Sequence, residues 1–400
     1  MSDLAGIVAF VVLLLLSVMV HEWGHFATAR RFGMKVTEFF VGFGPRLWSV
    51  RRGETEYGVK AVPAGGYVKI TGMTDLEPVA PEDEPRAFYR APARQRAVVL
   101  AAGSAMHFAI GLALLLFVFM ALGSPVLGTR LAEVTSCVPA TAGAECAPGD
   151  PQSPAAAAGL QSGDTVVAVN GTPVEDWAGL TEPIRASAGT PMTFTVERDG
   201  QQQEVTVVPA TVERTDPTTG EPVTVGYVGI SPQVTMDRAG PVEAIGSTLR
   251  GTWAILVGTA QALAQLPEKV VDLVRTLAGD QERDPNGLVG IVGAADISGQ
   301  LASGDLPPAA RVGDVLLLVA SFNLFVGVFN LLPLLPLDGG HLAVLGYEQL
   351  RNWWARRRGR PEPGRVDMTR LMPLAYVVFV FFVGLTLLLV AADVLKPVQL

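Results

Sequence analysis

Four long apolar runs constrain the fold of this chain more than any other feature of its sequence. They cover residues 4–20, 97–122, 312–332 and 371–392. A helix that crosses the hydrocarbon core of a bilayer needs about 20 apolar residues, and each run approaches or exceeds that length. The third run contains Ser321, Asn323 and Asn330, so a buried helix of a soluble protein is an alternative for it. We therefore predict a polytopic α-helical membrane protein with about four transmembrane helices.

The lysines and arginines are unevenly divided among the loops that join these runs. They concentrate between the first two runs and between the last two, whereas residues 123–310 contain few for their length. Because cytoplasmic loops carry an excess of Lys and Arg, we expect both basic loops in the cytoplasm and residues 123–310 outside. The net charge of −8, without a basic stripe, argues against nucleic acid as a partner.

A metal-binding pattern ends the first run, which reads His21-Glu22-Trp23-Gly24-His25. On a helix, positions i and i+4 share one face, so both imidazoles can bind one Zn²⁺ while Glu22 acts as general base. So short a pattern also arises by chance, but the chain has only four histidines and two of them form it. Ionisable groups at membrane depth are costly and indicate function. We predict one catalytic zinc ion per chain.

Catalytic zinc takes three protein ligands, and residues 330–341 are the best place to find the third. Asp338 is the only carboxylate there, and Pro333 and Pro336 should end the helix before it. The first and third spans run in the same direction, so their ends lie on the same side. A solvent-facing Asp338 after a simple helix stop is the alternative. His341 competes as third ligand, or it could orient a ligand or cap the helix.

Two further polar residues lie in the second and third runs. Asn330 is a candidate for substrate positioning, because its amide could donate to a substrate carbonyl, although an interhelical hydrogen bond explains it equally well. His107, in the second run, is interpreted as a buried hydrogen-bonding residue.

Residues 33–72 contain short alternating stretches divided by glycines, which predicts β-hairpins directly after the metal motif. A membrane-associated β segment beside the site could hold an extended peptide along a strand edge. We assign Gly65, Gly66 and Tyr67 to substrate positioning on this basis. Residues 74–90 are acidic and proline-rich and are expected to form a linker.

Residues 125–210 are expected to form a separate α+β domain, because a short helix, a Gly-Asp turn and alternating strands follow one another. The order resembles a bacterial PDZ domain, with the signature Ala158-Gly-Leu-x-x-Gly-Asp-x-Val166. PDZ domains bind peptides by strand addition, and residues 126–129 are a candidate carboxylate-binding loop. Cys137 and Cys146 lie in this region, and an oxidising compartment favours a disulfide between them over two free thiols.

Taken together, these motifs resemble the site-2 protease family of intramembrane zinc metalloproteases, in its bacterial branch with an extracytoplasmic PDZ domain. A Gly-Phe-Gly-Pro segment at 42–45 and a Pro-x-Gly-Gly-Tyr-Val segment at 63–68 add to the likeness. The family's zinc ligands correspond to His21, His25 and Asp338, and its general base corresponds to Glu22. The second span departs from the family's Gly-Pro-x-x-Asn motif, since it reads Gly103-Ser-Ala-Met-His107, which leaves any role for that span open.

The resemblance implies regulated intramembrane proteolysis at the inner (plasma) membrane of a bacterial cell, with the active site toward the cytoplasm. The implied partners are the lipid bilayer, single-span membrane substrates such as anti-sigma factors, and a peptide ligand of the PDZ domain. Two alternatives are a non-catalytic PDZ membrane scaffold and a metal transporter. Glu22 argues against the first, and ligands collected at one depth argue against the second.

In chain order we expect a first transmembrane helix at 1–25, a cytoplasmic β-hairpin region and linker at 26–96, a second transmembrane helix at 97–122, an extracytoplasmic PDZ domain and following strand at 123–232, an extracytoplasmic amphipathic helical region at 233–310, a third transmembrane helix with the Leu-Asp-Gly motif at 311–346, a basic cytoplasmic loop at 347–370 and a fourth transmembrane helix at 371–393.

Overall fold

A computed structural model describes residues 2–73, 78–139, 141, 146–215, 222–279, 283–284 and 287–399. The chain forms two compact units, of which the first combines residues 1–122 with 238–400 and the second comprises residues 123–237. Part of the expected linker, residues 74–77, lies outside the described residues.

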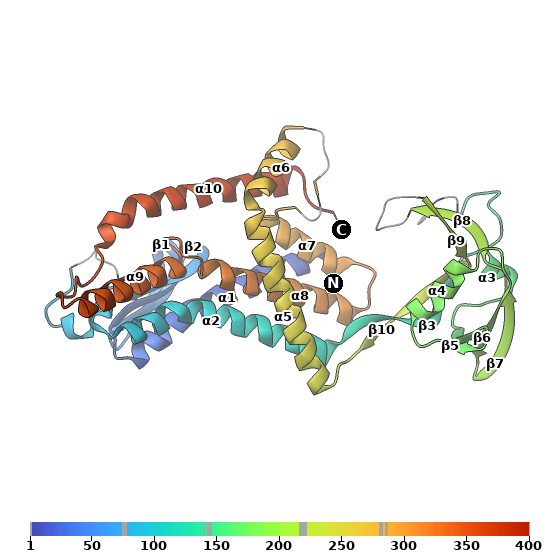
Figure 1. Cartoon of the computed structure of the whole chain (residues 1–400), viewed down its shortest axis with the longest axis horizontal. Helices are drawn as coiled ribbons and strands as arrows, with labels where there is room; N and C mark the ends of the chain where they lie inside the picture. The colour runs from blue at the N-terminus through green and yellow to red at the C-terminus, as the bar shows by residue number, and fades with distance from the viewer. Residues whose placement is uncertain are drawn as a thin grey trace. The chain divides into compact units, whose positions relative to one another are not determined.

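The first unit is built on helices that can cross a bilayer. Within the described ranges, four helical segments are long and apolar enough to do so: Asp3–Arg31, Ala93–Leu122, Pro308–Asn330 and Met368–Leu395. They contain the helices α1 (Asp3–Arg31), α2 (Ala93–Phe117), α8 (Pro308–Asn330) and α10 (Met372–Leu395), with a π-helical turn at Val118–Leu122 after α2. Helix α2 packs against both α1 and α8 (Figure 1). This confirms the prediction of a membrane protein with about four spanning helices.

The remaining helices of this unit are the 3₁₀ turns Glu84–Arg86, Phe88–Arg90 and Met368–Leu371, and the α-helices α5 (Pro241–Ala264), α6 (Leu266–Ala278), α7 (Ile291–Ser303) and α9 (Asp338–Arg357). Helix α7 differs from the expected amphipathic surface helix, because it is packed into the unit. Its Ala294 and Ala295 are buried with Phe10 of α1, and its Ser298 donates a hydrogen bond of 3.0 Å to the Gly6 carbonyl. Small residues on α7 allow this close approach.

The expected third span, 311–346, is interrupted. Helix α8 ends at Asn330 and α9 begins at Asp338. Pro333 and Pro336 lie in the gap, where each removes a backbone donor that a continuous helix needs. Gly339 then packs directly on the preceding turn, since a Cβ there would lie 2.2 Å from the Leu331 carbonyl oxygen. This break brings Asp338 to the first position of α9.

Strands β1 (Val36–Arg52) and β2 (Thr55–Ile70) form the β segment that was predicted after the metal motif. The two strands fold over one another, so that Phe39 has Val68 on one side and Tyr57 on the other. Residues 46–52 pair with residues 55–60. Residues 66–70 therefore have a strand neighbour on one side only, within the described part of the chain, and form an edge of this sheet.

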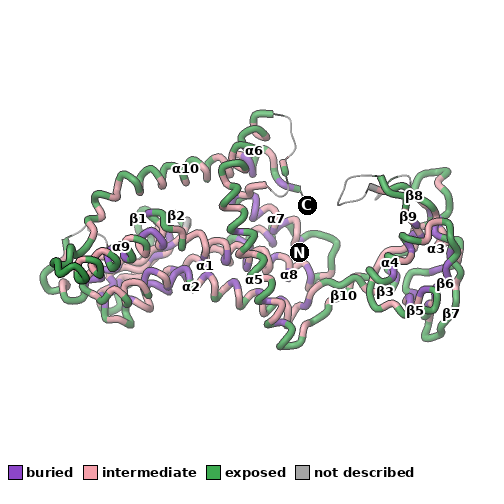
Figure 2. The backbone as a smooth tube through the Cα atoms, in the orientation of Figure 1, coloured by how far each residue is buried: buried purple, intermediate pink, exposed green. Residues whose placement is uncertain are grey.

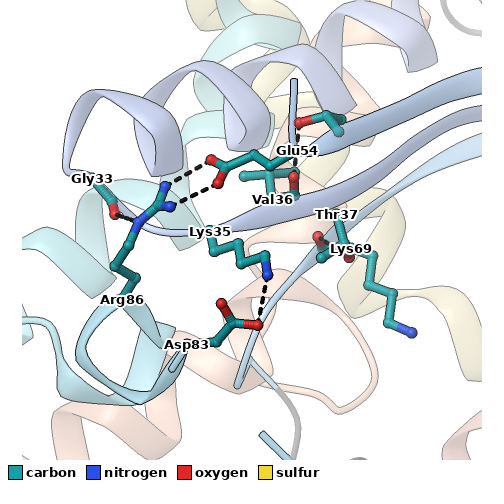
Figure 3. Close-up of polar contacts among 9 residues, drawn as sticks. Gly33, Lys35, Val36, Thr37, Glu54, Lys69, Asp83 and Arg86 are labelled. Carbon is teal, nitrogen blue, oxygen red and sulfur yellow. Dashed lines mark hydrogen bonds and ion pairs between the residues drawn. The ribbon is translucent and has the colours of Figure 1, made fainter. Parts of the chain in front are cut away.

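Polar contacts fix the base of this sheet to the segment before α2 (Figure 3). Arg86 donates two hydrogen bonds of 2.7 Å to the Glu54 carboxylate and a third, of 3.0 Å, to the Gly33 carbonyl. Lys35 forms an ion pair with Asp83 at 2.6 Å. A bidentate Arg–carboxylate pair is geometrically specific, so residues 78–90 of the expected linker are held against the sheet.

The second unit contains a β-sheet in the order β10-β3-β4-β6-β7, with β5 paired to β4 and a separate hairpin of β8 and β9. The elements are β3 (Ser124–Val134), α3 (Pro154–Ala157), β4 (Thr165–Val169), β5 (Thr172–Pro173), α4 (Trp177–Ala186), β6 (Met192–Arg198), β7 (Gln201–Val207), β8 (Ala210–Thr215), β9 (Pro222–Tyr227) and β10 (Ile230–Asp237). Buried hydrophobic residues of this unit form a core of their own, and Figure 2 colours the backbone purple where residues are buried.

Three features of the second unit bear on the sequence predictions. Residues 126–129 lie inside strand β3 rather than in a loop, so their assignment as a carboxylate-binding loop is wrong. Asp164, in the predicted Gly-Asp turn, is buried and accepts two hydrogen bonds of 2.7 Å from Arg198. Cys137 and Cys146 are joined by a disulfide bond.

Candidate active site

Helices α1 and α9 bring the candidate metal ligands together. Helix α1 carries His21 and His25 on one face, and Asp338 begins α9. The Nε2 atoms of the two histidines are 3.2 Å apart. The Asp338 Oδ2 atom lies 3.4 Å from Nε2 of His21 and 3.3 Å from Nε2 of His25. Residues distant in sequence therefore form a nearly equilateral triangle of ligand atoms.

The triangle fits one zinc ion. Zn–N and Zn–O bonds of about 2.0–2.2 Å in a tetrahedron place neighbouring ligand atoms about 3.3 Å apart, which matches all three edges. Asp338 Oδ2 is buried and accepts no hydrogen bond within the described part of the chain, as expected of an atom kept for a metal. Gly103 of α2 faces the triangle, and a Cβ there would lie 2.4 Å from His25 Nε2. The site thus has space where a side chain would block it.

A hydrogen bond from α1 to α2 orients one of the ligands. His25 Nδ1 lies 2.7 Å from the Val99 carbonyl oxygen, which can only accept. Nδ1 therefore carries the proton, and the lone pair of Nε2 in the neutral ring points into the triangle. Zinc-binding histidines commonly have such a second partner, which fixes the ring and its tautomer.

Glu22 lies between the ligand triangle and the edge of the β-sheet. A Cβ built on Gly66 would lie 3.4 Å from Cγ of Glu22 and 2.9 Å from Sδ of Met19, so the strand passes close to α1 at this point. The candidate base therefore lies beside a strand whose outer edge has no strand partner among the described residues.

The other predicted site residues differ in their placement. Gly65 and Gly66 lie on the sheet edge beside α1, whereas the Tyr67 hydroxyl donates to Glu38 within the sheet itself. Burial and this hydrogen bond raise the pKa of Tyr67, so the hydroxyl stays protonated. Asn330 is the last residue of α8, and among the described residues its side chain forms no hydrogen bond to the ligand triangle. His341 lines a small cavity with Arg96 and Glu348 instead of joining the triangle.

Sequence reasoning missed one neighbour of the site. Asn323 of α8 lies 2.9 Å from the Nδ1 atom of His107 through its Oδ1 atom, and the His107 ring is centred 5.0 Å from the ring of His21. Both residues are almost completely buried. The available signal was that polar residues in apolar runs usually face the interior of a helix bundle.

Comparisons with known proteins agree with this geometry. Residues 9–368 match peptidase family M50. The chain is 41% identical to the zinc metalloprotease Rip1 of Mycobacterium tuberculosis over the full length of both proteins. It is 39% identical to Rip1 of Mycolicibacterium smegmatis, over 99% of this chain and 98% of that protein. A putative zinc metalloprotease of Rhizobium meliloti is 31% identical over 86% of each chain. The chain therefore belongs to peptidase family M50, the site-2 protease family of zinc metalloproteases.

Proposed function

We propose that this intramembrane zinc metalloprotease cuts single-span membrane proteins, such as anti-sigma factors, within or at the edge of their transmembrane segment. His21, His25 and Asp338 would hold the zinc ion, and Glu22 would act as the general base. We place the site toward the cytoplasmic side of the bacterial inner membrane, because the loops at 26–96 and 347–370 carry the basic residues. The second unit is then extracytoplasmic, which suits its disulfide.

One observation supports the proposal above all others. Glu22 lies next to the ligand triangle on one side and, on the other, next to the strand edge of residues 66–70, which has no strand partner among the described residues. A bound zinc ion polarises the scissile carbonyl and lowers the pKa of its water. Glu22 would act as the general base toward water and would pass the proton to the leaving amine. The acceptor and donor groups at the edge of residues 66–70 can hold the substrate backbone as an added strand.

The strand edge also answers a problem specific to helical substrates. A transmembrane helix satisfies all of its backbone amides internally, so a protease must unwind it before attack. Strand addition replaces the lost helical hydrogen bonds with new ones to residues 66–70. Gly66 has no side chain to keep the substrate away from Glu22, which explains why glycine suits this position.

We also propose that the second unit is a PDZ domain that docks or filters substrates. Its strand β10 is a sheet edge and follows Gly229, which has φ of +87°. In a PDZ domain the Val228-Gly229-Ile230 segment, directly before β10, would bind the terminal carboxylate of a peptide added along the β10 edge. This segment takes the place of the incorrect assignment to residues 126–129.

The test uses the full-length protein reconstituted in lipid with a single-span substrate. Glu22→Gln should abolish cleavage while the bound zinc stays near one ion per chain, because the ligand triangle is unchanged. Glu54→Gln is the matched control, since Glu54 pairs with Arg86 at the exposed base of the same sheet, and it should cleave normally. Wild-type rates in the Glu22 variant would reject the assignment of the base.

A further inference from the structure

The two histidines of the triangle differ in the support given to their outer ring nitrogen. His25 Nδ1 donates to the Val99 carbonyl. His21 Nδ1 is buried and has no hydrogen-bond partner among the described residues. A zinc-bound histidine almost always donates this N–H to a carbonyl, carboxylate or water. In this structure the outer nitrogen of His21 therefore has no partner at hydrogen-bonding distance, although the Gly103 backbone lies beside the ring.

The ring nearest to His21 on α2 is that of His107. The two ring centres are 5.0 Å apart and the planes are tilted by 45°. His107 does not belong to the group of side chains whose ligand atoms gather at the metal position, as far as the described chain shows. It therefore lies beside the triangle, next to the ligand whose outer nitrogen is unsupported.

The hydrogen bonds of Asn323 define which nitrogen of His107 is free to accept. Asn323 Nδ2 donates to the Val319 carbonyl at 2.8 Å, so its Oδ1 atom must face His107. An amide oxygen only accepts, so His107 Nδ1, at 2.9 Å, carries the proton. In the neutral ring, Nε2 then keeps its lone pair, and no hydrogen bond to it is found within the described residues.

The packing of α8 holds His107 in this orientation. A Cβ on Gly327 would lie 3.3 Å from Cβ of His107, so the two helices are in close contact beside the ring. His107 and Asn323 are 2% and 1% exposed. Water cannot readily replace either partner, and the pair is fixed from two helices.

We propose that His107, oriented by Asn323, is a positioning residue that accepts a hydrogen bond from Nδ1–H of His21. The resulting chain Asn323–His107–His21 fixes the tautomer of His21 so that Nε2 binds the metal. This inference rests on the proposed zinc site and extends its support to α2 and α8. The competing acceptor is the Gly103 carbonyl, which also faces His21.

The test measures zinc affinity of the full-length protein by chelator competition, together with the visible spectrum of the Co²⁺-loaded form. His107→Phe keeps a ring but has no acceptor, and it should weaken zinc binding by about 10–100-fold. His107→Gln offers an amide oxygen and should restore most of the affinity. Asn323→Leu should weaken binding as His107→Phe does, whereas Asn323→Asp should retain it because the carboxylate still accepts from Nδ1–H.

Reference variants separate the failure of this inference from failure of the zinc site. His25→Ala and Asp338→Ala should lose zinc, and Ser104→Ala, a buried change on the same helix, should bind as wild type does. If His107→Phe and Asn323→Leu bind zinc normally while His25→Ala does not, the Gly103 carbonyl supports His21 and our inference is wrong. If His25→Ala also binds normally, the zinc site itself is wrong. Equal loss in His107→Phe and His107→Gln would show a packing effect and would also overturn the inference.

Discussion

The substitution Gly103→Ala tests the geometry of the metal centre with a single methyl group. The added Cβ would lie 2.4 Å from Nε2 of His25, 2.5 Å from Cε1 of His21 and 2.6 Å from its Nε2. Non-bonded carbon atoms rest at about 3.5–4.0 Å, so the imidazoles and the methyl group must separate by about 1 Å. Metal ligands tolerate displacements of about 0.2 Å. At least one histidine must therefore leave its ligand position.

We expect Gly103→Ala to lower zinc affinity by more than about 10-fold, the lower range for loss of ligand support. Cleavage at saturating zinc should fall by about 10²-fold, as for other displacements of this size. The assay is chelator competition on the full-length protein in lipid, followed by single-turnover cleavage of a single-span substrate.

Gly111→Ala is the matched control for helix packing. It lies on the same helix, and its Cβ would meet the Leu324 side chain at 2.7 Å, away from the triangle. It should loosen the contact of α2 with α8 but leave zinc affinity within a few-fold of wild type. If both variants bind zinc equally well, the triangle is not held against Gly103 and the geometric reasoning fails.

Three further predictions concern the strand edge, the second unit and the C-terminal helix. Gly66→Val should reduce cleavage by at least about 10-fold with zinc content unchanged, because the added Cβ would lie 2.9 Å from Sδ of Met19 and would push the strand edge away from α1; normal cleavage would exclude substrate binding at this edge. The hydrogen bonds from Arg198 lower the pKa of Asp164, so this carboxylate stabilises the second unit at neutral pH and the effect is lost as the pH falls below about 4. Asp164→Asn should remove that part of the pH dependence of amide hydrogen exchange in β4 and β6. Asp393→Ala should cost about 3–5 kcal/mol, because it leaves the charge of the buried Arg283 guanidinium, now 2.7 Å from the carboxylate, without an anionic partner; unchanged hydrogen exchange at the start of α7 would contradict this.

The first two proposed metal ligands could be predicted from the sequence alone because they are local. His21 and His25 lie one helical turn apart, so helix geometry alone places them on one face. Asp338 required an argument from membrane topology, since only the shared direction of two spans brings it to the same side. The structure shows why that argument holds: α8 and α9 are separated by a proline-containing break. Gly339 and Gly340 then pack directly against the backbone of residues 331–335, which form that break.

Contacts between helices could not be inferred from the sequence. The pairing of His107 with Asn323 depends on how α2 and α8 are rotated about their axes, and both helices are apolar nearly all round, which leaves rotation undefined by periodicity. The burial of α7 against α1 was missed for the same reason, because its small residues carry no amphipathic signal. The double pairing of β1 was also hidden, since alternation reveals a strand but not its partners.

The position of Asp338 at the start of α9 links the broken backbone to the chemistry of the site. An anionic side chain in the first turn of a helix is stabilised by the positive end of the helix dipole, and α9 ends in Arg356 and Arg357, which suit the opposite end. A continuous helix through residues 311–346 would have placed Asp338 mid-helix, without that stabilisation and among satisfied backbone groups. The break therefore places the carboxylate where the helix dipole favours its charge, and it leaves polar backbone groups outside a helix. Such backbone persists only where protein or water covers it, and water is the second reactant of hydrolysis. The same interruption that ends α8 thus places Asp338 at the start of α9, beside His21 and His25.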